Sequence, residues 1–129
     1  MYEWLEDYIE LNKRLNYLEF DLEQSEMELE RWLSGDLMNV RLQAGSLSCK
    51  LENHIAERKK EIGRLQNIIK SLHNVIDKFD SVENLILKKK YIEGKTLEVI
   101  ADELGYSYGH VRRTHANIMK TLKFVDKLV

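Results

Sequence analysis

The amino-acid sequence predicts an all-α protein: a long N-terminal antiparallel helical hairpin or coiled coil, followed by a C-terminal helix-turn-helix domain. The 129 residues include no proline, the commonest helix breaker. Two long stretches place apolar residues at spacings that alternate between four and three. A shorter stretch, TLEVIADELGYSYGHVRRTH, joins two apolar-faced segments through a glycine. We expect the hairpin region in residues 1–79 and the helix-turn-helix domain in residues 80–129.

Each long stretch carries an apolar stripe with one polar exception. An average repeat of about 3.5 residues is the signature of a coiled coil, and it predicts helices over about 2–33 and 50–79. The first stripe consists of Trp4, Tyr8, Leu11, Leu15, Leu18, Leu22, Ser25, Leu29 and Trp32. The second consists of Leu51, Ile55, Arg58, Ile62, Leu65, Ile69, Leu72, Ile76 and Phe79.

Two stripes of equal length on one chain favour an antiparallel hairpin. Pairing their ends would place Ser25 opposite Arg58, and one polar layer of this kind can fix the register of a helix pair. The alternative is that each stripe pairs with its copy in a homodimer; a dimer built on the outer faces of the hairpin is a further option. The connector, residues 34–50, is too apolar for a free linker. We expect a short helix near 36–43 that caps the hairpin, with a partner-binding loop as the alternative.

The C-terminal third divides into three short helices. Asp80 and Glu83 have the spacing of a capping box, which predicts a helix start near residue 81. Gly94 fits the end of that helix, and Thr96 can cap the next one. Gly105 then provides a sharp turn, and Ser107 can cap the third helix. The inner faces consist of Leu85, Ile86, Tyr91, Leu97, Ile100, Ala101, Leu104, Val111, Thr114 or His115, Ile118 and Leu122.

The residue pattern that predicts a helix-turn-helix is more specific than a lone turn glycine. Ala101 stands four residues before Gly105, at the point where the two helices of such a motif cross closely. Residues 86–129 carry a net charge of +4, whereas residues 1–85 carry −6. Because exposed charges more than about 10 Å apart are largely screened at cellular salt, the basic third can attract DNA phosphates despite the overall charge of −2.

The segment YIEGKTLEVIADELGYSYGHVRRTHANIMKTL resembles the fourth conserved region of bacterial sigma factors, which contacts the upstream promoter element. It is also similar to small phage and prophage proteins of Gram-positive bacteria, including the ArpU-like late-gene regulators. The N-terminal stretch YLEFDLEQSEMELERWLSGDL resembles a phage-encoded family that carries such a region behind two helices. These resemblances imply a transcription regulator that binds double-stranded DNA. We expect it to recruit RNA polymerase and to work in the cytoplasm of a bacterial host. No segment resembles the sigma-factor part that melts DNA, so we do not expect it to initiate transcription alone.

The predicted DNA-binding residues lie on and around the third C-terminal helix. Arg112 and Arg113 are the main candidates for reading bases, because arginine can bind guanine with two hydrogen bonds. Tyr108 could contact a thymine methyl or a phosphate, and Gly109 would let the backbone approach closely. The expected phosphate contacts are Thr96, Ser107, His110, Lys88, Lys89 and Lys90. The sigma resemblance adds Lys120 and Lys123 as contacts to DNA or to another transcription protein. We expect Tyr106 to pack in the core or turn.

Nothing in the sequence predicts an enzyme. The four histidines lack the spacing of a helical zinc site, Cys49 is the only cysteine, and no phosphate-binding loop is present. We therefore expect no metal and no cofactor. No apolar run approaches the about 20 residues of a membrane span, and the N-terminus lacks a signal-peptide pattern. Two rival functions remain: a DNA-packaging protein of the small-terminase type, and a sigma mimic that binds RNA polymerase without its own DNA specificity.

Overall fold

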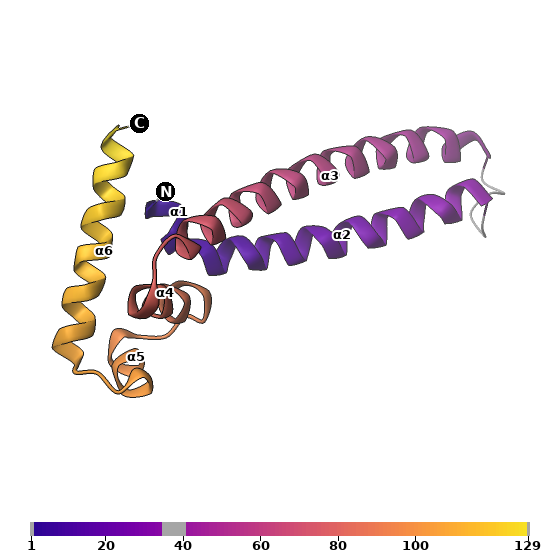
Figure 1. Ribbon diagram of the computed structural model, residues 1–129. Helices are drawn as coiled ribbons and strands as arrows, with labels where there is room; N and C mark the ends of the chain where they lie inside the picture. The colour runs from indigo at the N-terminus through magenta and orange to yellow at the C-terminus, as the bar shows by residue number, and fades with distance from the viewer. Residues whose placement is uncertain (1, 35–40, 129) are drawn as a thin grey trace. The chain divides into compact units, whose positions relative to one another are not determined.

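The computed structural model describes residues 2–34 and 41–128, and every regular element in these ranges is helical. The elements are α1 (Tyr2–Glu6), α2 (Tyr8–Ser34), α3 (Arg41–Asp77), α4 (Ser81–Leu87), the π-helical turn η1 (Lys88–Ile92), α5 (Leu97–Leu104) and α6 (Tyr108–Leu128). The prediction of an all-α chain is confirmed (Figure 1).

The chain divides into two compact units. One comprises residues 1–12 and 68–129 and is called the head unit below; the other comprises residues 13–67 and is called the hairpin unit. Helices α2 and α3 each contribute to both units. The predicted domain boundary between residues 79 and 80 stays a prediction.

The hairpin unit is a pair of long antiparallel helices, made by the parts of α2 and α3 within residues 13–67 (Figure 1). The predicted stripes face each other within the chain, as expected for an antiparallel hairpin. The buried members are Leu18, Ser25, Ile55, Ile62 and Leu65. Most other stripe residues of this unit are half-buried, since a pair of helices can cover only one face of each partner.

A polar cluster that includes Arg58, the polar member of the second stripe, crosses the hairpin. The Nε of Arg58 donates to Oδ2 of Asp21 at 2.8 Å, and the Nε2 of His54 lies 2.8 Å from the same oxygen. The hydrogen bond from His54, then that from Arg58, holds the pKa of Asp21 below its usual value. Arg58 therefore binds Asp21, which lies one helical turn before Ser25, the residue predicted opposite it. The apolar stripe alone did not reveal this pairing.

The N-terminal helix and the start of α3 differ from the expected bounds. Helix α1 ends at Glu6 and α2 begins at Tyr8, so the apolar face shifts at this break. Leu5 is therefore buried, whereas Trp4 is 42% exposed. Helix α3 begins at Arg41 rather than near residue 50. The predicted short helix near 36–43 falls mostly on residues 35–40, outside the described part of the chain.

The head unit packs around two apolar clusters. The larger consists of Leu5, Tyr8, Leu72, Ile76, Leu87, Tyr91, Ile118, Met119 and Leu122. The smaller joins α4, α5 and α6 through Ile86, Ile100, Ala101 and Val111. Helix α4 begins at residue 81 as predicted, but the Asp80 side chain makes no cap hydrogen bond. Instead, Nδ2 of Asn84 donates to the carbonyl oxygen of Ile76 at 2.9 Å and ties α4 to the end of α3.

Candidate nucleic-acid interface

Helix α5 is set by a cap at its start and a left-handed turn at its end. The Val99 N–H donates to Oγ1 of Thr96 at 3.3 Å, as the sequence predicted. Gly105 has φ +74°, in the left-handed region that glycine enters at least cost. The Tyr106 N–H then bonds the carbonyl oxygen of Ala101 at 3.1 Å and closes the helix end. These local contacts fix where the chain turns toward α6.

Helix α6 is the second helix of the motif, and its start is also capped. The His110 N–H donates to Oγ of Ser107 at 3.1 Å. Val111 is 0% exposed, and it packs with Ile100 and Ala101 of α5. Ala101 is 3% exposed, which fits the prediction that only a small residue is accommodated at this crossing. The core therefore holds α6 by one face and leaves the opposite face open.

The open face of α6 brings together most of the predicted DNA-binding residues. Tyr108, His110, Arg112, Arg113 and Lys120 are all exposed, and Gly109 is half-buried. At about 100° per residue, Gly109, Arg113 and Lys120 lie opposite the buried side, His110 and Arg112 flank them, and Tyr108 is exposed at the helix start. Neither guanidinium of Arg112 and Arg113 has a carboxylate partner within residues 2–34 and 41–128. A Cβ on Gly109 would lie 3.2 Å from Nη1 of Arg113, so glycine leaves room for that side chain.

Tyr106, which we expected in core or turn packing, lies in the turn and not in the core, beside this surface. It is 43% exposed, and its ring lies 5.0 Å from that of His110, centroid to centroid. Tyr106 lies in the turn two residues before α6 begins, and its ring reaches that of His110 in the first turn of the helix. The spacing of four residues between them was the available signal in the sequence. The core positions around the turn are instead filled by Ile100, Ala101 and Val111.

The three predicted phosphate-binding lysines have different surroundings. Lys88 is exposed and lies 3.8 Å from a carboxylate oxygen of Asp77. Lys89 donates to Oε2 of Glu103 at 2.8 Å. The Lys90 ammonium lies 5.6 Å from the centroid of the adjacent Tyr91 ring. The structure thus does not place the three ammonium groups in one common surface.

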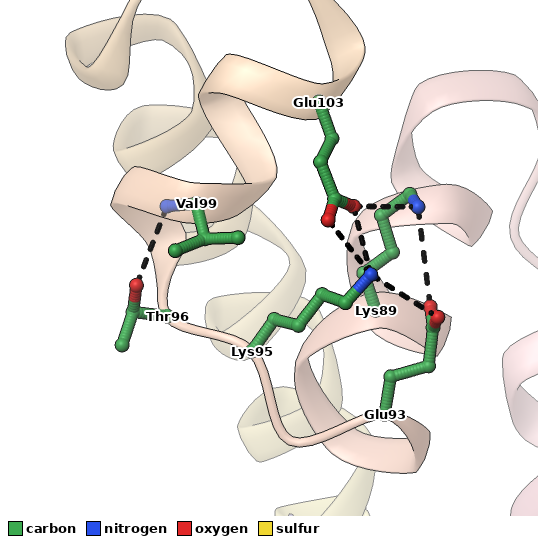
Figure 2. A network of polar contacts seen from close by, with 6 residues as sticks. All are labelled: Lys89, Glu93, Lys95, Thr96, Val99 and Glu103. Atoms are coloured by element: carbon green, nitrogen blue, oxygen red, sulfur yellow. Dashed lines mark hydrogen bonds and ion pairs between the residues drawn. The ribbon is translucent and has the colours of Figure 1, made fainter.

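Lys89 is part of a network that fixes α5 against η1 (Figure 2). The Lys95 ammonium donates to both carboxylate oxygens of Glu103, at 2.8 and 3.0 Å, and lies 3.3 Å from Glu93. The hydrogen bonds from Lys89 and then Lys95 hold the pKa of Glu103 below its usual value. Its hydrogen bond to Glu103 raises the pKa of Lys95. The network ties both ends of the loop before α5 to that helix.

Among the described residues, no group of three or more histidine, cysteine or acidic side chains is placed to hold a metal ion. In the same ranges, no helix combines the length and apolarity of a membrane span.

Residues 75–123 match the family model of sigma-70, region 4. The match runs from the last turn of α3 through α4, η1 and α5 into α6, entirely within the head unit. The head unit carries a sigma-70 region 4 domain. Such a domain binds DNA and regulates transcription, and it is not catalytic. The comparisons with curated proteins and with solved structures gave no match.

The match covers less than half of the chain, and it does not extend over residues 1–74. The part of the sequence resemblance that concerns region 4 is therefore confirmed. The resemblance to phage-encoded proteins and ArpU-like regulators is not.

Proposed function

We propose that this protein binds duplex promoter DNA through the open face of α6 and regulates transcription. The observation that carries the proposal is the position of Arg112 and Arg113. Both lie in the second turn of α6, exposed, on the helix that a region 4 domain presents to DNA. The first turns of such a helix face the base edges in the major groove. Arginine there can bind guanine through two hydrogen bonds.

The neighbouring residues have supporting roles in this proposal. Tyr108 and His110 flank the arginines, and Gly109 keeps the backbone accessible. Thr96 and Ser107 cap the starts of α5 and α6, where backbone N–H groups also favour phosphate. Lys88 and Lys120 are exposed enough to reach the DNA backbone. Lys90 is half-buried and stays a weaker candidate. Lys89 already binds Glu103, so we assign it to holding α5 rather than to DNA.

A single head of this size makes few base contacts, so specific binding needs a second source of affinity. We propose RNA polymerase as one source. A surface for a protein partner lies in the hairpin unit, on the face of α2 turned away from the buried stripe. Tyr17, Phe20 and Met27 are 64%, 60% and 55% exposed there. Glu23 and Glu28 flank them by helical position, and these carboxylates would repel DNA.

The same surface disfavours the predicted homodimer through the N-terminal helices. Two copies of α2 paired through this face would bring glutamates near glutamates, which costs free energy. We therefore favour a different protein on this surface. The origin in a phage or prophage and the place of action in a bacterial cytoplasm stay predictions.

Selection of random duplex DNA by the full chain, at two salt concentrations, tests the proposal. We expect an enriched motif, and Arg113→Ala to weaken binding to it by about 1–3 kcal/mol and relax one base position. Lys70→Ala is the matched control, since it removes one exposed positive charge from the head unit away from α6. It should leave the motif unchanged.

Other outcomes would favour the rivals. Salt-sensitive binding without an enriched motif would contradict a stand-alone regulator. Binding that survives the double change Arg112→Glu and Arg113→Glu would favour a polymerase-binding sigma mimic. Closed rings of eight or more copies would favour a packaging protein.

A further inference from the structure

The head unit has an apolar groove that the DNA-binding proposal does not use. It lies between the last turns of α3 and the C-terminal half of α6, and its volume is about 480 Å³. Its lining is Val75, Lys78, Phe79, Thr121, Leu122, Val125 and Asp126. Val125 is 48% exposed, so this apolar lining is open to solvent.

The apolar surface continues from the groove along the end of α6. Phe124 and Leu128 are 63% and 71% exposed. Thr121, Val125 and Leu128 follow the spacing i, i+4, i+7, which places them on one face of the helix. One wall of the groove and the exposed side chains beside it therefore belong to the same helix.

We propose that this surface binds a second copy of the chain in a two-fold dimer. In a two-fold interface the same patch serves both partners, so it must contain both a groove and the side chains that fill it. Here Phe124 and Leu128 of one copy would enter the groove of the other. A two-fold axis through this patch would set the two α6 helices antiparallel.

The distance along α6 links this dimer to DNA, a step that rests on the proposed function. Twelve residues separate Arg113 from Val125, and at about 1.5 Å per residue they span about 18 Å. Two antiparallel α6 helices that cross near Val125 would hold their Arg113 residues about 36 Å apart. Half-sites of dimeric helix-turn-helix proteins are about 34–36 Å apart, which is one turn of the duplex. The dimer would therefore read two half-sites on one side of the DNA.

Analytical ultracentrifugation of the full chain without DNA tests the interface. We expect a monomer–dimer equilibrium, and Phe124→Ser to raise the dimer Kd about 10-fold or more, because few buried aromatic residues dominate such interfaces. Phe20→Ser is the matched control, since Phe20 is 60% exposed in the hairpin unit against 63% for Phe124. It should leave the Kd unchanged. Helical circular dichroism of both variants verifies that the fold is kept.

A second substitution in the patch gives an independent measurement. Leu128→Ser should also raise the dimer Kd, since Leu128 is 71% exposed beside the groove. A chain that stays monomeric at all concentrations would overturn the proposal. So would a dimer that Phe20→Ser dissociates and Phe124→Ser does not, because its interface would lie on the hairpin.

Selection of random duplex DNA distinguishes the dimer proposal from the DNA-binding proposal. An inverted repeat with half-sites one turn apart, reduced to a single half-site by Phe124→Ser, supports the dimer. A single half-site for the unaltered chain would overturn the dimer and leave the DNA-binding proposal standing.

Discussion

The two units of this protein are stabilised by burial to different extents, although α2 and α3 run through both. In the head unit, several helices surround the core, and Ile76, Ile86, Leu87, Ile100 and Val111 are each 0% exposed. In the hairpin unit, Ile55 and Ile62 keep 7% exposure, and most of the stripe is half-buried. Because hydrophobic stabilisation grows with apolar area removed from water, the same kind of residue contributes more in the head.

The difference in burial between the two units suits different tasks. A helix that positions arginines against base edges must be held firmly, and α6 is held by two clusters. A two-helix arm with one seam opens more readily. Each unit also contains one tryptophan, Trp4 in the head and Trp32 in the hairpin. The single-tryptophan variants Trp32→Phe and Trp4→Phe therefore allow the unfolding of each unit to be followed by fluorescence.

The largest expected contrast comes from two isoleucines on the same stripe of α3. Ile76→Ala should lower the free energy of unfolding of the head by about 4 kcal/mol, because the site is fully enclosed and leaves a cavity. Ile62→Ala should cost the hairpin about 2 kcal/mol, the lower end of the range for such changes. Urea unfolding of the single-tryptophan variants measures both. Equal costs would mean that the two units are equally well packed.

Two glycines should respond to alanine with opposite signs. Gly94 in the head has φ +74°, and an added Cβ would lie 2.9 Å from Cδ1 of Ile9. Gly94→Ala should therefore destabilise the head by about 1–2 kcal/mol. Gly63 lies within α3 of the hairpin, and a Cβ there would meet nothing within 4 Å. Gly63→Ala should stabilise the hairpin by up to about 1 kcal/mol through helix propensity. Thermal unfolding distinguishes the two, and a loss of stability in Gly63→Ala would reveal an undetected close approach.

The smallest expected contrast between the two units is in how their stability depends on pH. Burial, and secondarily the charge of Lys90, lowers the pKa of His115 in the head. The unfolded chain then binds more protons below about pH 6.5, so the stability of the head should fall from that pH downward until the folded pKa is passed. In the hairpin, Asp21 has a lowered pKa. Its contribution is present above about pH 3.9 and is lost as the pH falls through the folded pKa.

Unfolding of the single-tryptophan variants between pH 7.5 and 3 checks both windows. His115→Gln should flatten the loss of stability near pH 6 in the head. Asp21→Asn should remove only the acid loss in the hairpin. An unaltered slope in His115→Gln would assign the loss near pH 6 to other groups.

Features that depend on the local spacing of residues could be predicted from the sequence. Stripes of period 3.5 predicted the hairpin, and Thr96, Gly105 and Ser107 predicted the bounds of α5 and α6. The missed features depend on three-dimensional neighbours. The pairing of Lys89 with Glu103 joins residues far apart in sequence, so a run of three lysines looked like one charged surface. The binding of Arg58 by Asp21 and His54 depends on which side chains reach across the hairpin. The π-helical turn at Lys88–Ile92 has no simple spacing signal.

The head unit combines segments that are far apart along the chain, and this affects the order in which the two units fold. Residues 1–12 pack with residues 68–129, so this unit cannot be completed until nearly all of the chain has left the ribosome. The hairpin unit needs only residues 13–67, and its contacts can form earlier. Once formed, it brings the first helix close in space to the segment that follows residue 67. The long loop that would otherwise have to close by chance is then already closed, and the entropy cost of joining the two ends of the head unit falls.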